Sequence, residues 1–111
     1  MSEIEEVTAT EAIELSTGAS RLIDVREPDE WEAGHAVGAQ SLPLSQLLER
    51  MDELPKDETL LLICQGGVRS MRAATALDQA GYTVINVAGG TSAWQSAGGA
   101  MVADGPAAPH N

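Results

Sequence analysis

An uninterrupted apolar run near the middle of the chain, Thr59-Leu60-Leu61-Leu62-Ile63, constrains the fold more than any other feature of the sequence. The run is too short for a typical helix, and it lacks the polar alternation of a half-buried strand. Apolar runs of this length are typical of parallel strands whose sheet is covered on both faces. The run therefore predicts a central strand of a parallel sheet.

Short apolar runs and short helical patterns alternate along the rest of the chain, which is typical of α/β layering. Thr8 and Glu11 have the spacing of a capping box, so Thr8 is the predicted N-cap of the first helix. The predicted strands are 4–7, at a sheet edge, then 21–25, 41–44, 59–63 and 83–87. The predicted helices are 8–18, 28–34, 45–51, 70–80 and a last one that begins at Thr91.

The length of 111 residues suits a single domain covering residues 1–111. Residues 101–111 contain Gly105, Pro106 and Pro109, and we expect them to form a flexible C-terminal tail. No run approaches the roughly 18 apolar residues that a membrane-spanning helix requires. The N-terminus is acidic where a secretory signal is basic, so we expect a cytoplasmic protein that does not bind membranes.

Charge and cysteine content exclude further classes of function. The formal net charge is −11, which repels phosphate backbones and argues against nucleic-acid binding. Cys64 is the single cysteine, so the chain can form no internal disulfide, no zinc ribbon and no Cys-x-x-Cys redox pair. We expect neither a metal ion nor a cofactor.

The segment after the predicted central strand carries the candidate chemistry: Cys64-Gln65-Gly66-Gly67-Val68-Arg69-Ser70, called here the cysteine loop. Ligands of open parallel sheets bind at the carboxyl ends of the strands, which is where Cys64 is placed. Gly66 and Gly67 can adopt backbone conformations that side chains disfavour, so consecutive N–H groups could point at one sulfur atom. The cysteine loop is therefore a predicted anion-binding site.

We expect the pKa of Cys64 to be depressed by the loop N–H groups, by the N-terminus of the following helix, and by Arg69 with Arg72 one turn further. Lowering a thiol pKa from about 8.5 to about 6 corresponds to roughly 3.4 kcal/mol. A helix terminus supplies at most about 2 kcal/mol, so amides and arginine must provide the rest. A lone cysteine is commonly an inert buried residue, but this loop favours a nucleophile.

Four segments, which are named at the end of this paragraph, resemble the rhodanese (sulfurtransferase) family in sequence and in order, and the resemblance covers about residues 4–98. The resemblance implies a doubly wound parallel sheet of about five strands with helices on both faces. It also implies that Cys64 accepts a sulfane sulfur as a persulfide and passes it to a nucleophilic acceptor. In the second segment the family commonly has proline where this chain has Val37. The segments are Leu22-Ile23-Asp24-Val25-Arg26-Glu27-Pro28, Gly34-His35-Ala36-Val37-Gly38-Ala39, the cysteine loop, and Gly89-Gly90-Thr91-Ser92-Ala93-Trp94.

The resulting prediction is a thiosulfate sulfurtransferase. Cys64 attacks the outer sulfur of the donor, sulfite leaves, and the persulfide is discharged onto cyanide or a thiol, including a protein thiol. Arg69 is the candidate for orienting an anionic donor, and Ser70 is interpreted first as a helix N-cap. An alternative is a persulfide relay or protein-binding module with little thiosulfate turnover. The candidate binding residues are Gln65, Gly66, Gly67, Val68, Arg69 and Ser70.

The length of the loop separates sulfur transfer from a related chemistry. Phosphatases with a similar strand, loop and helix place five residues between cysteine and arginine, whereas four separate Cys64 from Arg69 here. The shorter loop favours a single sulfur over a phosphate group. Outside the loop we interpret Asp24 and Arg26 as structural, His35 as a packing and hydrogen-bonding residue, and Trp31 and Trp94 as core residues, while the role of Arg72 stays open.

Overall fold

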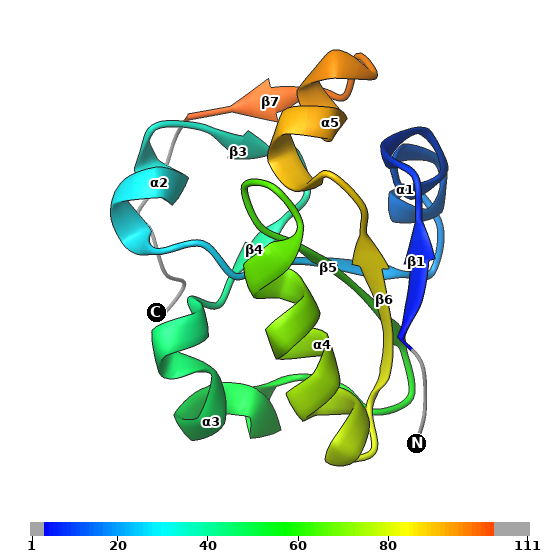
Figure 1. The fold of residues 1–111 in the computed structure, drawn as a ribbon, viewed down its shortest axis with the longest axis vertical. Helices are drawn as coiled ribbons and strands as arrows, with labels where there is room; N and C mark the ends of the chain where they lie inside the picture. The colour runs from blue at the N-terminus through cyan, green and yellow to red at the C-terminus, as the bar shows by residue number, and fades with distance from the viewer. Residues whose placement is uncertain (1–3, 104–111) are drawn as a thin grey trace.

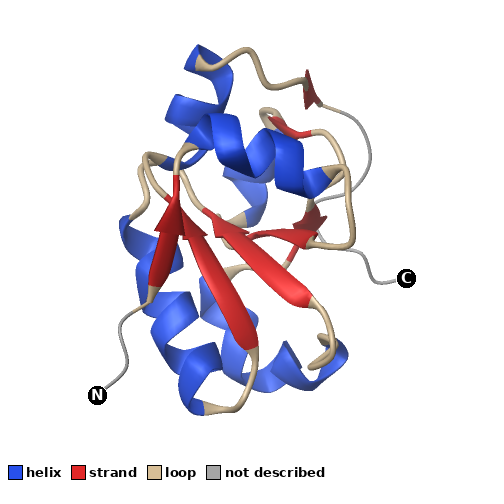
Figure 2. Ribbon diagram, turned by 90° about the vertical axis from the view of Figure 1, so that its right-hand side faces the viewer, coloured by secondary structure: helices blue, strands red, loops and turns tan. Residues whose placement is uncertain are grey.

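The computed structural model describes residues 4–103, which form a parallel sheet between two layers of helices (Figures 1 and 2). The five strands lie in the order β1 (Glu5–Val7), β6 (Thr83–Val87), β5 (Thr59–Ile63), β2 (Arg21–Asp24) and β4 (Gln40–Ser41), all parallel to their neighbours. The predicted fold class is confirmed, with β5 at the centre of the sheet and β1 at an edge.

The side chains of β5 alternate between two apolar cores. Leu60 and Leu62 pack on one face, together with α3 (Leu47–Arg50) and α4 (Val68–Gln79). Leu61 and Ile63 pack on the other face, against α1 (Ala9–Ser16) and α5 (Gly90–Ser96). Burial on both sides of a strand favours apolar side chains at successive positions, which is why this segment of the sequence is apolar.

The order of the strands reverses between β2 and β5. These two strands are neighbours, but the chain leaves β2 toward β4 and leaves β5 toward β6, on the opposite side. Such a reversal opens a crevice at the carboxyl ends of the two strands, where α/β proteins bind ligands. Asp24 ends β2 and Cys64 directly follows β5, so the topology brings these two segments to the crevice.

Two predicted elements differ from the structure in the segment after β4. The predicted strand at 41–44 ends at Ser41, and Pro43, which lacks an N–H group, precedes a 3₁₀-helix, η1 (Leu44–Gln46). The predicted helix at 45–51 is divided into η1, the short α3 and a second 3₁₀-helix, η2 (Met51–Glu53). The local pattern therefore indicated helical structure correctly but not its interruption.

The helix α1 begins as predicted from its capping box. The Glu11 N–H group donates to Thr8 Oγ1 at 3.1 Å, and the Thr8 N–H group donates to the Glu11 carboxylate at 2.9 Å. The next helix, α2 (Pro28–Glu32), has proline in its first turn, as its sequence also predicts. In the described part of the chain, no helix has the length and apolarity needed to cross a membrane.

The C-terminal prediction is partly wrong. Met101 and Val102 do not belong to a flexible tail, since they form β7 (Met101–Val102), antiparallel to β3 (His35–Ala36). The indole N–H of Trp94 donates to the carbonyl oxygen of Ala100 at 3.1 Å, which holds the chain against α5 just before β7. The rest of the predicted tail, 104–111, lies outside the described residues.

The residues expected in the core are confirmed there. Trp31 and Trp94 are buried, and so is His35. The rings of Trp31 and His35 stack with 3.4 Å between centroids, and His35 Nδ1 lies 2.9 Å from the carbonyl oxygen of Trp31. His35 is therefore a packing and hydrogen-bonding residue of the segment after α2.

Candidate active site

The helix α4 begins at Val68, two residues before its predicted start. Its N-cap is Gly67, whose φ of +101° lets the chain turn directly into the helix. Ser70 is consequently inside the first turn of α4, so the prediction that Ser70 is the N-cap is wrong. The hydroxyl of Ser70 is thereby free to point at the sulfur of Cys64.

The two glycines of the cysteine loop have different roles. A Cβ atom at Gly67 would lie 3.1 Å from the backbone nitrogen of Gly89 and would strain the left-handed backbone. Gly66 does not have a positive φ, and a Cβ atom there would meet nothing within 4 Å. The prediction that both glycines supply unusual conformations therefore holds for Gly67 alone.

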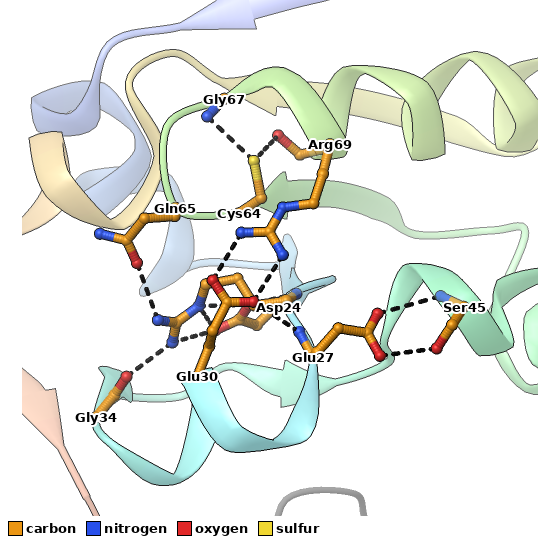
Figure 3. Close-up of polar contacts among 11 residues, drawn as sticks. Asp24, Glu27, Glu30, Gly34, Ser45, Cys64, Gln65, Gly67 and Arg69 are labelled. Atoms are coloured by element: carbon orange, nitrogen blue, oxygen red, sulfur yellow. Dashed lines mark hydrogen bonds and ion pairs between the residues drawn. The ribbon is translucent and has the colours of Figure 1, made fainter.

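The sulfur of Cys64 accepts hydrogen bonds although the residue is only 1% exposed. The Gly67 N–H group donates to Sγ at 3.0 Å, and the Ser70 hydroxyl donates at 3.3 Å (Figure 3). Burial raises the pKa of Cys64, but the Ser70 hydroxyl and the N–H groups of Ser70, Gly67 and Gly66 outweigh it. The pKa consequently lies below its ordinary value, in the predicted direction.

The first turn of α5 holds the opposite side of the cysteine loop. The Thr91 N–H group donates to the carbonyl oxygen of Cys64 at 2.7 Å, and the Ser92 N–H group donates to that of Gln65 at 3.2 Å. Because α5 binds these carbonyl oxygens, the following N–H groups are left to face the sulfur. The sequence predicted a helix from Thr91 but not this contact with the loop.

Gly90 allows α5 to approach the loop so closely. Its φ is +58°, and a Cβ atom there would overlap the carbonyl oxygen of Cys64 and lie 2.8 Å from the carbonyl carbon of Gln65. On β6, the buried Asn86 adds a second support, since its Nδ2 donates to the carbonyl oxygen of Gly67 at 3.3 Å. In the sequence, the features that indicate these two contacts are the doublet Gly89-Gly90 and the polar Asn86 inside a mostly apolar strand.

Arg69 is engaged by a carboxylate that the sequence did not single out. Its Nη1 and Nη2 atoms lie 2.6 and 2.8 Å from the two carboxylate oxygens of Glu30, on α2. Figure 3 shows the arginine extending from α4 to reach this side chain. The Arg69 hydrogen bonds lower the pKa of Glu30 to about 2, and Glu30 in turn raises that of Arg69. Arg72, one turn further along α4, is exposed.

Asp24 and Arg26 have the structural role expected of them. Both are buried, and Arg26 Nη2 lies 2.9 Å from Asp24 Oδ2. Arg26 also donates to the carbonyl oxygen of Gly34 at 2.7 Å and to Gln65 Oε1 at 3.2 Å. The side chain of Gln65 continues to Ser92 Oγ, at 2.9 Å. Gln65 thus connects the end of β2 with α5.

A cavity of about 370 Å³ lies beside the cysteine loop. Arg26, Glu30 and Gln65 form its polar side, and Met101 and Val102 of β7 contribute apolar surface. The cavity therefore adjoins the Arg69–Glu30 pair through Glu30 and the cysteine loop through Gln65. Between residues 4 and 103, no group of three or more His, Cys, Asp or Glu side chains is placed to hold a metal ion.

Comparisons with known proteins agree with this architecture. The uncharacterized protein YqhL of Bacillus subtilis is 50% identical over 76 residues, which are 68% of this chain and 60% of YqhL. A protein named sulfurtransferase from Allochromatium vinosum is 40% identical over 83 residues, 74% of this chain and 78% of that protein. This chain thus spans less than two thirds of the length of YqhL.

A solved structure extends the likeness to nearly the whole fold. The rhodanese-related protein from Thermoplasma volcanium superposes with a TM-score of 0.85 at 31% identity, covering 90% of this chain and 99% of that one. Residues 8–97 match the family model of the rhodanese-like domain. These residues include β2, the cysteine loop and the start of α5, which together build the site. The chain therefore belongs to the rhodanese-like domain family.

Proposed function

We propose that the protein is a sulfurtransferase in which Cys64 receives a sulfane sulfur from thiosulfate or a similar donor and passes it to a thiol or to cyanide. The observation that carries this proposal is the sulfur of Cys64, which accepts hydrogen bonds from Gly67 N–H and the Ser70 hydroxyl at the carboxyl end of a central strand. The relative named sulfurtransferase supports the same reaction class.

The loop suits both halves of such a reaction. In the first, the Cys64 thiolate attacks the outer sulfur of thiosulfate, the S–S bond breaks, and its electron pair leaves with sulfite. In the second, an acceptor thiolate or cyanide attacks the outer sulfur of the persulfide, and the electron pair returns to Cys64. N–H and hydroxyl donors stabilise negative charge on sulfur in the thiolate and in the persulfide alike. These 111 residues hold one cysteine, so no second cysteine among them can be the acceptor.

A persulfide relay, which hands sulfur between proteins with little thiosulfate turnover, is the second candidate. One observation favours it: Arg69, the expected partner of thiosulfate, is engaged by Glu30. A phosphatase is disfavoured because four residues, and not five, separate Cys64 from Arg69. Phosphatase activity would appear as turnover of an aryl phosphate that Cys64→Ser abolishes.

Intact-mass analysis tests the proposal. The protein is incubated with thiosulfate or with glutathione persulfide, and its mass is then measured before and after addition of cyanide. We expect one added sulfur atom that cyanide removes and that Cys64→Ser never acquires. If neither donor adds sulfur to the wild-type protein, or if Cys64→Ser acquires it equally, the proposed function is wrong. Sulfur gained from the persulfide but not from thiosulfate would exclude thiosulfate as the donor.

A further inference from the structure

Arg69 is the one cationic residue of the cysteine loop, and its two terminal nitrogens are already bound by a carboxylate. Both of its terminal nitrogens face the Glu30 carboxylate, at 2.6 and 2.8 Å, in the paired geometry that is strongest for arginine and a carboxylate. Thiosulfate could take this paired contact on Arg69 only by displacing Glu30, although the guanidinium has further N–H groups. An anionic donor therefore competes with Glu30 for Arg69.

The position of Glu30 is maintained by contacts that do not involve Arg69. Its Oε1 also accepts the N–H of Glu27 at 3.1 Å, and its own N–H donates to the carbonyl oxygen of Glu27 at 3.0 Å. The carboxylate of Glu27 is held in turn by the Ser45 hydroxyl at 2.8 Å. The side chain of Glu30 is thus fixed at the first turn of α2, and it would stay beside the loop if Arg69 moved away.

The charges that act most directly on Arg69 are negative, although the exposed Arg72 lies one turn further along α4. Glu27, in addition to Glu30, raises the pKa of Arg69 through its negative charge, as Cys64 does when it is a thiolate. The neighbouring cation, Arg26, is paired with the buried Asp24. The whole chain adds a net charge of −11. A donor with two negative charges is therefore repelled more strongly than one with a single charge or none.

We propose that Glu30 determines donor specificity: by occupying Arg69, it makes thiosulfate a poor donor and leaves the site suited to a thiol persulfide, R–S–SH. This inference rests on the proposed sulfur transfer through Cys64. The Cys64 thiolate attacks the terminal sulfur of R–S–SH, the S–S bond breaks, and R–S⁻ leaves with the electron pair and takes a proton from water. The product, Cys64–S–SH, loses its proton and is stabilised by the loop donors. Glu30 acts through Arg69 and is thus a positioning residue.

The test compares two donors in matched variants. Glu30→Gln removes the charge and keeps the shape, Glu30→Ala removes the side chain, and Glu32→Gln removes an exposed charge from the same helix as a control. With thiosulfate, we expect both Glu30 variants to raise kcat/KM by about tenfold, mainly through a lower KM, as one charge-assisted hydrogen bond to the donor implies. Glutathione persulfide has no sulfonate oxygens beside its reacting sulfur to bind Arg69, so with this donor we expect less than about a twofold change. Glu32→Gln should alter neither value.

Ionic strength supplies a readout that a merely structural role of Glu30 would not change. In Glu30→Gln, Arg69 attracts thiosulfate, so added potassium chloride should lower kcat/KM for this donor, whereas in the wild-type protein it should raise it. If both donors respond alike to Glu30→Gln and Glu30→Ala, or if the salt response keeps its sign, the inference is wrong while sulfur transfer stands. If wild-type Cys64 takes sulfur from neither donor, both the inference and the proposed function are wrong.

Discussion

The hydroxyl of Ser70 lies 3.3 Å from the sulfur of Cys64, inside the first turn of α4. This contact exists because Gly67 turns the chain into the helix early, which places the buried Ser70 above the thiol. A hydroxyl in this position stabilises a thiolate without adding a charge to the site. It offsets part of the burial that would otherwise keep Cys64 protonated.

Replacing Ser70 should make Cys64 less reactive. In Ser70→Ala the thiolate loses its hydroxyl donor, so the pKa of Cys64 should rise. Iodoacetamide alkylation at neutral pH should slow by roughly fivefold, about the effect of one hydrogen bond, and its pH profile should move to higher pH. Thr75→Ala is the control, because the Thr75 hydroxyl donates to the carbonyl oxygen of Met71 on the same helix. An unchanged profile in Ser70→Ala would contradict the assigned role.

The glycines of the cysteine loop should respond differently to alanine. Gly67→Ala forces a side chain into a left-handed conformation and toward the backbone of Gly89, so it should lower the free energy of unfolding by about 1–3 kcal/mol. Gly66→Ala meets open space and should change it by less than about 0.5 kcal/mol. Urea denaturation measures both. Equal losses in the two variants would show that the backbone of the loop is not as described.

Gly90→Ala should be more damaging than a glycine replacement that adds backbone strain alone. Its Cβ atom would overlap the carbonyl oxygen of Cys64, so we expect a loss of about 3 kcal/mol in the free energy of unfolding. Gly98 also has a positive φ but open space around it, so Gly98→Ala should cost only about 1 kcal/mol. The difference between the two variants, measured by urea denaturation, reports the contact of α5 with the loop. A difference near zero would argue against that contact.

The Glu30–Arg69 pair predicts a particular loss of stability in acid. The pKa of Glu30 is about 2 in the folded protein, against an ordinary value of 4.5 that applies when the chain is unfolded. A depressed carboxyl pKa contributes stability that is fully present above pH 4.5 and is lost as the pH falls toward 2. Glu30→Gln should therefore show a smaller decrease in the free energy of unfolding between these pH values. Parallel curves for wild type and variant would contradict the pairing.

Much of the fold could be predicted because its causes are local. The predicted strands 59–63 and 83–87 have the same bounds as β5 and β6, since burial in a covered sheet favours short, mostly apolar segments. Thr8 caps α1 as predicted, because a capping box involves residues three positions apart. The strand β7 was missed because its stability comes from β3, far away in the chain.

The candidate site divides in the same way. The position of Cys64 at a strand end and the lowered direction of its pKa followed from neighbouring residues. The exact start of α4 could not be predicted, because two adjacent glycines look alike in sequence. The role of Ser70 depends on that start, so it could not be predicted either. The tertiary structure distinguishes the two glycines, since the turn between β6 and α5 approaches Gly67 closely and leaves Gly66 free.

The sequence by itself determined the α/β fold, the central strand and the placement of one cysteine beside donors of hydrogen bonds. Only the tertiary structure decided which carboxylate pairs with Arg69. Glu30 lies 39 positions earlier in the chain, and the two side chains come together because β2 and β5 are neighbours in the sheet. Local patterns report burial and backbone conformation, whereas the pairing of distant charges depends on which elements the completed fold places side by side.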